Sequence, residues 1–173
     1  MRVRADGAAR GATPLHGGNG RSVLRADLEL RAQTAETIKL YHRATFCLQP
    51  AGDGLTRKGI VDALTVGCIP VVFHSEVLKA WRWHWGGWAA EATVTYDVDA
   101  VVAGKLDVVS ELARLPEARV ARMQRVIARH ARRMQYASSD EHRGDAFEAI
   151  LQGMWQRART HSAVHKASET SDG

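Results

Sequence analysis

The residue types in this 173-residue chain that could do chemistry gather in one short loop and the turn of helix predicted after it. Gly52 and Gly54 leave the loop backbone accessible, and Thr56, Arg57 and Lys58 follow. A helix N-terminus presents unpaired N–H groups and a partial positive charge. A hydroxyl and two cations beside such a terminus suit the binding of a diphosphate.

Two further side chains point to the same place. Asp62 stands four residues after Lys58, and helical side chains lean towards the helix N-terminus, so its carboxylate faces the loop and could accept hydrogen bonds from a ribose. The alternative for Asp62 is a surface ion pair with Lys58. His74 follows the next predicted strand, where it either contacts the same ligand or serves as a solvated or capping histidine. Neither a GxGxxG nor a GxxxxGK[ST] fingerprint is present.

The elements that must position these residues form a βαβ unit. Short apolar runs at 45–48 and 69–73 predict buried strands, and apolar residues at helical spacing predict a helix over 56–66, ended by Gly67. Strands joined in this way are parallel, with a right-handed crossover. Ligands of open α/β sheets bind at the carboxyl ends of the strands, which is where the loop at 50–55 lies.

The remaining pattern predicts one α/β domain over 22–158, flanked by disordered segments at 1–21 and 159–173. A helix runs from Ser22 to about residue 43, a third strand covers 92–96, and helices cover 106–115 and the residues after Pro116. A last helix is expected over 145–157. The residues expected to face the core on the last two helices are Val120, Met123, Ile127 and Met134, then Phe147, Ile150, Leu151 and Met154.

Composition excludes several classes of protein. A hydrophobic content of 45% rules out a long disordered centre, and no run of about 18 apolar residues is present to span a membrane. Cys47 and Cys68 rule out a disulfide scaffold and a four-cysteine zinc site. We expect both to be free cysteines acting as small buried hydrophobes, with a disulfide or a reactive thiol as the alternative.

Three other features have a structural and a functional interpretation. Tryptophans at 81, 83, 85 and 88 are expected to pack in the core, although indole rings also stack on ligands. Arginines at 122, 125, 129 and 132 predict a solvated helix face rather than a nucleic-acid site. His161 and His165 have metal-ligand spacing, but they lie in the segment expected to be disordered, so we predict no metal site.

The stretch 46–74 resembles the exostosin-type glycosyltransferases, in particular their plant and algal branch with the xyloglucan galactosyltransferases. The resemblance is carried by Phe46–Pro50, Gly52-Asp53, Thr56-Arg57-Lys58, Asp62 and Gly67–Val71. A looser similarity extends over 40–157 and includes Leu115-Pro116-Glu117 and Asp145-Ala146-Phe147. Lys58 departs from the family pattern, which commonly has arginine there.

The resemblance implies a Rossmann-like half of a GT-B fold, with a parallel sheet flanked by helices and a helical C-terminal end. This half binds the nucleotide-sugar donor, usually a UDP-sugar, and the enzyme transfers the sugar to a glycan acceptor with inversion and without a metal or other cofactor. Thr56 and Arg57 would hold the diphosphate, Asp62 would meet the ribose, and Gly52 and Asp53 would shape the donor loop. The resemblance also implies a place in the Golgi, with membrane attachment through a segment absent from this chain.

Length opposes a complete two-domain enzyme, because about one domain fits in 173 residues. The general base that an inverting transferase needs is expected from the other half, so no catalytic residue is assigned. One alternative is a non-catalytic, truncated nucleotide-binding module. A basic nucleic-acid binder, suggested by the net charge of +5, is the weaker alternative, and no nucleic-acid partner is predicted.

Overall fold

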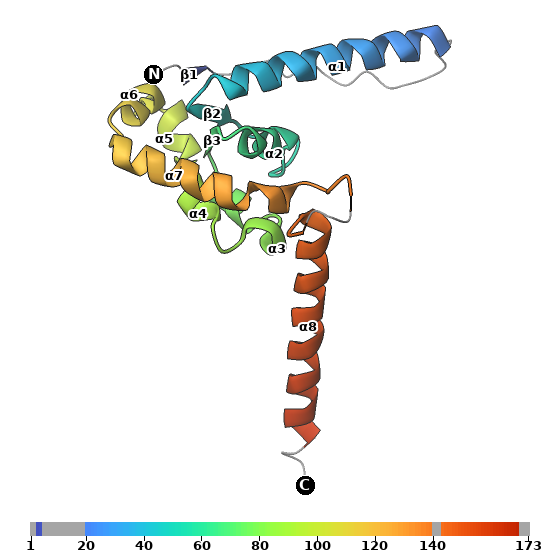
Figure 1. The fold of residues 1–173 in the computed structure, drawn as a ribbon. Coiled ribbons are helices and arrows are strands. Elements are labelled where there is room, and N and C mark those ends of the chain that lie inside the picture. Colours follow the sequence, from blue (N-terminus) through green and yellow to red (C-terminus); the bar gives the residue numbers. More distant parts are fainter. Residues whose placement is uncertain (1–2, 5–19, 140–142, 170–173) are drawn as a thin grey trace.

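A computed structural model describes residues 3–4, 20–139 and 143–169, with side chains described over 29–139 and 143–161. The chain is a mixed α/β structure in which helices surround a small parallel sheet, as the sequence predicts (Figure 1). The strands β1 (Val3–Arg4), β2 (Phe46–Gln49), β3 (Ile69–Val72) and β4 (Val94–Thr95) lie in that order and are all parallel. β1 falls in the segment expected to be disordered, whose other residues before Gly20 lie outside the described parts.

The predicted βαβ unit is confirmed. The helix α2 (Lys58–Thr65) connects β2 to β3, whose register pairs Phe46 with Ile69 and Gln49 with Val72. Gly67 ends the helix as expected: its φ of +79° allows the N–H of Cys68 to bond the carbonyl of Ala63 at 2.9 Å. α2 begins at Lys58 rather than at Thr56, with Arg57 in extended conformation at the N-cap.

Helices lie where the sequence predicts them over about 22–43, within 106–115 and after Pro116, whereas the short helices between 75 and 92 and over 98–102 were not predicted. α1 covers Gly20–His42 and packs against α2. After β3 come η1 (Ser75–Lys79), α3 (Arg82–Trp85) and α4 (Ala89–Ala92), and after β4 come α5 (Val98–Val102) and α6 (Val108–Ala113). α7 (Glu117–His130) and η2 (Ala131–Met134) bury Met123, Ile127 and Met134 as predicted. None of the described helices is long and apolar enough to cross a membrane.

The final helix, α8 (Ala146–Glu169), corrects a prediction. Phe147, Leu151 and Met154, which were expected to face the core, are each at least half exposed. The buried positions are instead small residues, Ala146, Ala149 and Gly153, because the Trp83 ring lies directly against Gly153. The helix continues beyond residue 158 to Glu169 and extends away from the rest of the fold (Figure 1).

Asp145 explains why α8 begins where it does. Its carboxylate accepts hydrogen bonds from the backbone N–H groups of Glu148 and Ala137, both at 2.9 Å. The first of these is an N-cap bond, and the second ties the helix start to the segment that follows η2. These bonds lower the pKa of Asp145, the bond from Glu148 most strongly.

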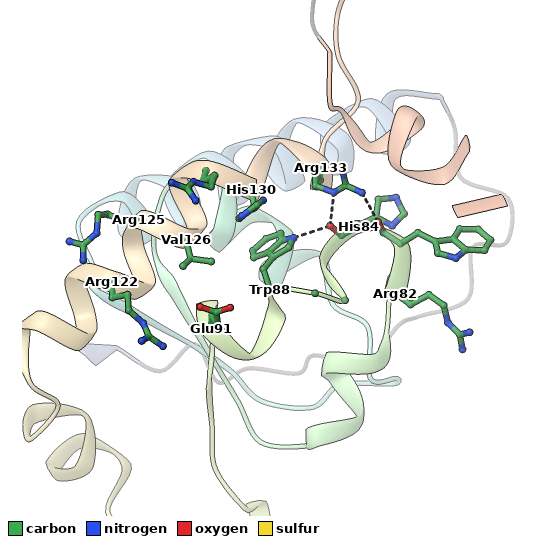
Figure 2. A pocket seen from close by; sticks show the side chains of 13 residues that line it. Arg82, His84, Trp88, Glu91, Arg122, Arg125, Val126, His130 and Arg133 are labelled. Carbon is green, nitrogen blue, oxygen red and sulfur yellow. Dashed lines mark hydrogen bonds between the residues drawn. The ribbon is translucent and has the colours of Figure 1, made fainter. Parts of the chain in front are cut away.

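Trp81, Trp85 and Trp88 pack in or against the core, as expected, whereas Trp83 lies against Gly153 of α8. Trp85 is fully buried and Trp88 is 7% exposed. The Trp85 ring meets Trp81 and Trp88 edge-on, with centroids 5.7 and 6.2 Å apart. Trp88 also stacks on His130 of α7, with centroids 5.5 Å apart, and Figure 2 shows these two rings side by side. The cluster therefore joins the α3–α4 region to α7.

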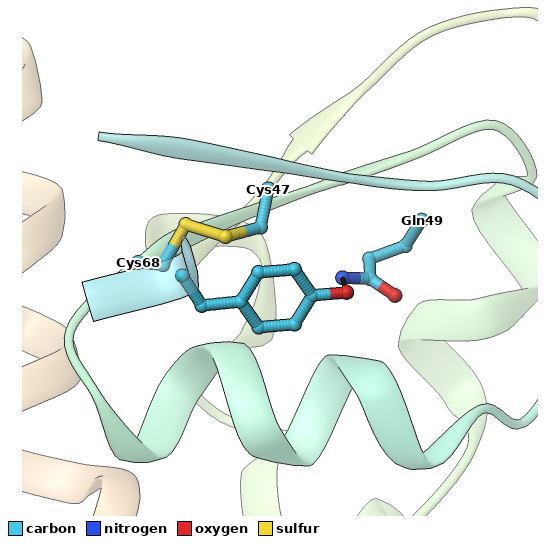
Figure 3. Close-up of a disulfide and its surroundings, with 4 residues drawn as sticks. Cys47, Gln49 and Cys68 are labelled. Atoms are coloured by element: carbon cyan, nitrogen blue, oxygen red, sulfur yellow. Dashed lines mark hydrogen bonds between the residues drawn. A yellow bond between two sulfur atoms is a disulfide. The ribbon is translucent and has the colours of Figure 1, made fainter. Parts of the chain in front are cut away.

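The prediction of free cysteines is wrong, because Cys47 and Cys68 form a disulfide (Figure 3). The two residues are 21 positions apart in sequence, but their Cα atoms are 6.0 Å apart. The β2–β3 register places Cys47 on one strand beside the start of the other, and the turn at Gly67 delivers Cys68 to that point. Both are buried next to Tyr41 and Ala63.

Candidate functional site

The carboxyl ends of β2 and β3 form one edge of the sheet, because Gln49 and Val72 are paired across the two strands. The loop before α2 and the residues after β3 therefore meet at this edge. A small hollow of about 10 Å³ lies between them; its lining is mostly apolar and includes Gln49, Arg57 and His74. The structure thus brings together two of the residues predicted as donor-binding from the sequence, Arg57 and His74.

Arg57 holds the loop in shape. Its Nη1 donates a hydrogen bond to the carbonyl of Pro50, which spans the loop from one end to the other. The guanidinium lies beside Gly52, where an added Cβ would be 3.6 Å from Cζ. Arg57 is half-buried, so a donor N–H remains available at the edge of the sheet.

His74 caps the next helical turn. Its Nδ1 accepts a hydrogen bond of 3.2 Å from the backbone N–H of Glu76, at the start of η1. This is the capping role that the sequence left open as an alternative. Because the side chain is exposed and lines the hollow, capping fixes the ring where it faces the loop.

Lys58 and Asp62 form the ion pair that was the alternative to ribose binding. The Lys58 ammonium lies 2.6 and 2.7 Å from the two carboxylate oxygens of Asp62. The Lys58 side chain is 71% exposed and that of Asp62 19% exposed. Asp62 does lean back towards the helix start as predicted, but it meets Lys58 there.

The other predicted residues surround the hollow without lining it. Gly52, Asp53 and Thr56 are exposed in the loop. Since α2 begins at Lys58, Thr56 lies two residues before the helix; of the N–H groups in the first turn, that of Ile60 already donates to the Arg57 carbonyl at 3.1 Å. This arrangement leaves the loop hydroxyl and the helix N-terminus open to solvent on one side of the edge.

Gln49 and Gly59, which were not among the predicted site residues, support the loop from within the fold. Gln49 is buried at the end of β2, and its Nε2 donates to the Tyr41 hydroxyl at 3.1 Å. Gly59 of α2 packs so closely that a Cβ there would lie 2.6 Å from Gln49 Oε1. A polar residue closing an apolar strand, followed ten residues later by a helical glycine, is the signal that could have identified this contact.

A second concave site lies away from the sheet edge, between α3, α4 and α7. Its volume is about 620 Å³, and it is lined by Trp88 and His130 together with arginines of α3, α7 and η2. The sequence indicated the tryptophans and the arginine-rich helix face as separate features and did not predict that they line one cavity. Arg133 lines this cavity, whereas the predicted Arg132 does not.

A metal centre finds no support in the described part of the chain. No group of three or more histidine, cysteine, aspartate or glutamate side chains there could hold a metal ion. His161 is exposed on α8, and the side chain of His165 lies outside the described residues.

Comparison with known proteins agrees with the sequence resemblance. Residues 15–85 match the Exostosin GT47 domain. A probable xyloglucan galactosyltransferase GT15 of Arabidopsis thaliana is 31% identical over 128 residues, which are 69% of this chain and 27% of the relative. The xyloglucan galactosyltransferase MUR3 of the same plant is 29% identical over 121 residues, 68% of this chain and 20% of the relative.

A shorter stretch is more similar. The xyloglucan-specific galacturonosyltransferase 1 of Arabidopsis thaliana is 43% identical over 53 residues, which cover 30% of this chain and 8% of the relative. No solved structure matches the chain. The chain spans about a quarter of the length of the curated relatives it matches. With the motif at 46–74 placed on a parallel βαβ unit, these matches show that the chain belongs to the exostosin-type family, in the branch that resembles the plant xyloglucan galactosyltransferases.

Proposed function

We propose that this chain is the donor-binding half of a glycosyltransferase with the GT-B architecture. It would bind a nucleotide sugar, most simply a UDP-sugar, and act with an acceptor-binding half to transfer the sugar to a glycan with inversion. The observation that carries the proposal is that Arg57 and His74 lie together at the carboxyl edge of the sheet, beside the start of α2. Such an edge is where open α/β sheets bind nucleotides.

The chemistry of the edge suits a diphosphate. The Arg57 guanidinium offers planar N–H donors that match phosphate oxygens, and the first turn of α2 adds backbone N–H groups and a partial positive charge. These groups would neutralise the charge that develops on the departing diphosphate. Thr56 would add a hydroxyl, and Asp62 would reach the ribose once Lys58 turns to the phosphates.

The relatives support the substrate classes. Their names describe the transfer of galactosyl and galacturonosyl groups to xyloglucan. Such a transfer requires an activated sugar and a polysaccharide acceptor. The disulfide supports a lumenal compartment such as the Golgi, because disulfides persist in oxidising compartments. The general base belongs to the acceptor half in this proposal, so the chain alone binds the donor without transferring the sugar.

Calorimetric titration with UDP and UDP-galactose tests the donor site. Arg57→Ala should weaken binding at least tenfold, about 1.4 kcal/mol, because the guanidinium contact to the diphosphate is lost. Arg57→Lys should recover only part of the affinity, since an ammonium keeps the charge but not the paired N–H donors.

Arg114→Ala is the matched control. Arg114 is an exposed arginine on the C-terminal side of α6, where it pairs with Glu111. Its removal should leave UDP binding within twofold. A folded parent chain that binds neither ligand would contradict the proposal and leave the family membership as ancestry without donor binding.

A further inference from the structure

The cavity between α3, α4 and α7 is separate from the sheet edge. Its volume of about 620 Å³ falls in the range of small-molecule sites. No residue that lines it also lines the hollow beside Arg57. A ligand in this cavity would therefore contact none of the residues that line the hollow.

The cavity carries a large excess of positive charge. Five arginines line it, Arg82, Arg122, Arg125, Arg129 and Arg133, against one carboxylate, that of Glu91. With both lining histidines neutral, four positive charges remain in excess. Figure 2 shows the Arg122 side chain extending from α7 on the same side as Glu91, whereas Arg125 points away from Glu91.

The α7 arginines are available to a ligand. Arg122, Arg125 and Arg129 are exposed, and among the described residues none of them forms an ion pair. Solvated arginines on a free helix face are common, but here three of them line one wall of a cavity. Holding like charges together without anions is unfavourable, and an anionic ligand would remove that cost.

The opposite wall of the cavity is fixed in advance. Arg133 donates from Nε and Nη2 to the carbonyls of His84 and Trp83, at 3.2 and 2.9 Å. The Trp88 indole N–H donates to the His84 carbonyl at 3.0 Å, and its ring stacks on His130. Figure 2 shows these bonds converging on one short turn of backbone. Because these hydrogen bonds fix the wall in advance, binding would not have to order it.

His84 lines the cavity beside Arg133. The Nδ1 atom of His84, which lines the cavity, is buried and has no hydrogen-bond partner in the described part of the chain. Burial lowers the pKa of His84; the Trp81 carbonyl opposes this shift, and Arg133 adds to it. In Figure 2 the His84 ring points away from Arg122 and Arg125, so this atom is not part of the wall that the α7 arginines form.

We propose that this cavity is a second anion site, which binds a diphosphate group on Arg122, Arg125 and Arg129. Arginine pairs two N–H donors with two oxygens of one phosphoryl group. A diphosphate carries several negative charges at neutral pH, so it balances more of the excess than one carboxylate would. The diphosphate comes either as the free ion or as part of a nucleotide.

Titration calorimetry with inorganic diphosphate and with UDP tests this site on the full chain. The variant Arg122→Gln/Arg125→Gln should weaken diphosphate binding at least tenfold. Both side chains are exposed, so the fold should be unaffected, which circular dichroism checks. The matched control is Arg114→Gln/Arg119→Gln, which removes the same charge from exposed positions outside the cavity and should change affinity less than twofold.

Arg57→Ala separates this site from the donor site. Diphosphate binding that survives Arg57→Ala and is lost in Arg122→Gln/Arg125→Gln supports the second site whether or not the donor site exists. If UDP binding falls in parallel in the α7 variant, the nucleotide is the source. If only inorganic diphosphate is affected, the site takes the free ion.

Three results would overturn the second site. One is an equal loss in the control variant, which would indicate attraction by net charge alone. Another is diphosphate binding abolished by Arg57→Ala and untouched in the α7 variant. The third is saturable binding of polygalacturonate, but not of diphosphate, that needs Arg122 and Arg125; the cavity would then be an acidic-polysaccharide site.

Discussion

At the scale of the residue, the loop before α2 depends on side chains that have two roles each. Arg57 closes the loop through the Pro50 carbonyl, and His74 caps η1 through the Glu76 N–H. Both nevertheless line the same hollow. A ligand at this edge would therefore meet groups that are already oriented, which lowers the entropic cost of binding.

Gly59 should be required for the support beneath this loop. In Gly59→Ala the new methyl group would displace the buried Gln49 amide from Tyr41. We expect unfolding free energy to fall by about 1–2 kcal/mol, because the strained contact outweighs the ~1 kcal/mol that alanine gains in helix propensity. Urea denaturation measures it. Gly54→Ala, whose Cβ would meet nothing within 4 Å, is the control and should stay within about 0.5 kcal/mol. A Gly59→Ala variant as stable as the parent would refute this role.

At the scale of the element, α8 shows how packing decides which side of a helix is buried. The apolar residues Phe147, Leu151 and Met154 share a face at helical spacing, yet that face is exposed. The helix instead docks through the smaller Ala146, Ala149 and Gly153. The aromatic ring of Trp83 fills the space that a larger residue at position 153 would need.

Gly153→Ala should loosen the docking of α8 on α3. The added methyl group would overlap the Trp83 ring, so either the ring or the helix must move. Overpacking of this kind costs about 1–3 kcal/mol of unfolding free energy. Guanidinium denaturation followed by tryptophan fluorescence reports both the loss and the altered Trp83 environment. Leu151→Ala on the same helix is the control, and its half-exposed side chain should cost little. If Leu151→Ala lowered the unfolding free energy more than Gly153→Ala does, α8 would dock through its apolar face instead.

At the scale of the whole molecule, the described residues form two buried clusters. The larger one surrounds Phe46, Trp85, Leu112 and Ile127 and joins the sheet to α7. The smaller one consists of Tyr41, Cys47, Ala63 and Cys68 and joins the sheet to α1 and α2. The small cluster buries little apolar area. The disulfide within it therefore supplies a large share of the free energy by which this cluster stabilises the fold.

Reduction of the Cys47–Cys68 bond should lower the unfolding free energy by about 3 kcal/mol, the value expected for a closed loop of roughly this length. Denaturation with and without a reducing agent measures the difference. The variant Cys47→Ala/Cys68→Ala is the control, since reductant should not change its stability. Two titratable thiols in the unreduced, denatured chain would show that the bond does not form.

The local sequence was sufficient to predict the βαβ unit. The apolar runs that become β2 and β3, the helical spacing of α2 and the stop at Gly67 are all short-range signals, and parallel pairing follows from them. The same signals placed Arg57 and His74 at one edge of the sheet. The motif at 46–74 also indicated the family, because its residues occupy consecutive positions of the βαβ unit.

Contacts between distant residues were decided only by the tertiary structure. Cys47 and Cys68 looked like separate buried hydrophobes until the strand register brought them together. The inward face of α8 depended on the Trp83 ring, about 70 positions earlier in the chain. The basic cavity likewise joins α7 to the tryptophan region. Periodicity shows which residues share a side of an element, but the neighbour that covers this side is set by packing between elements.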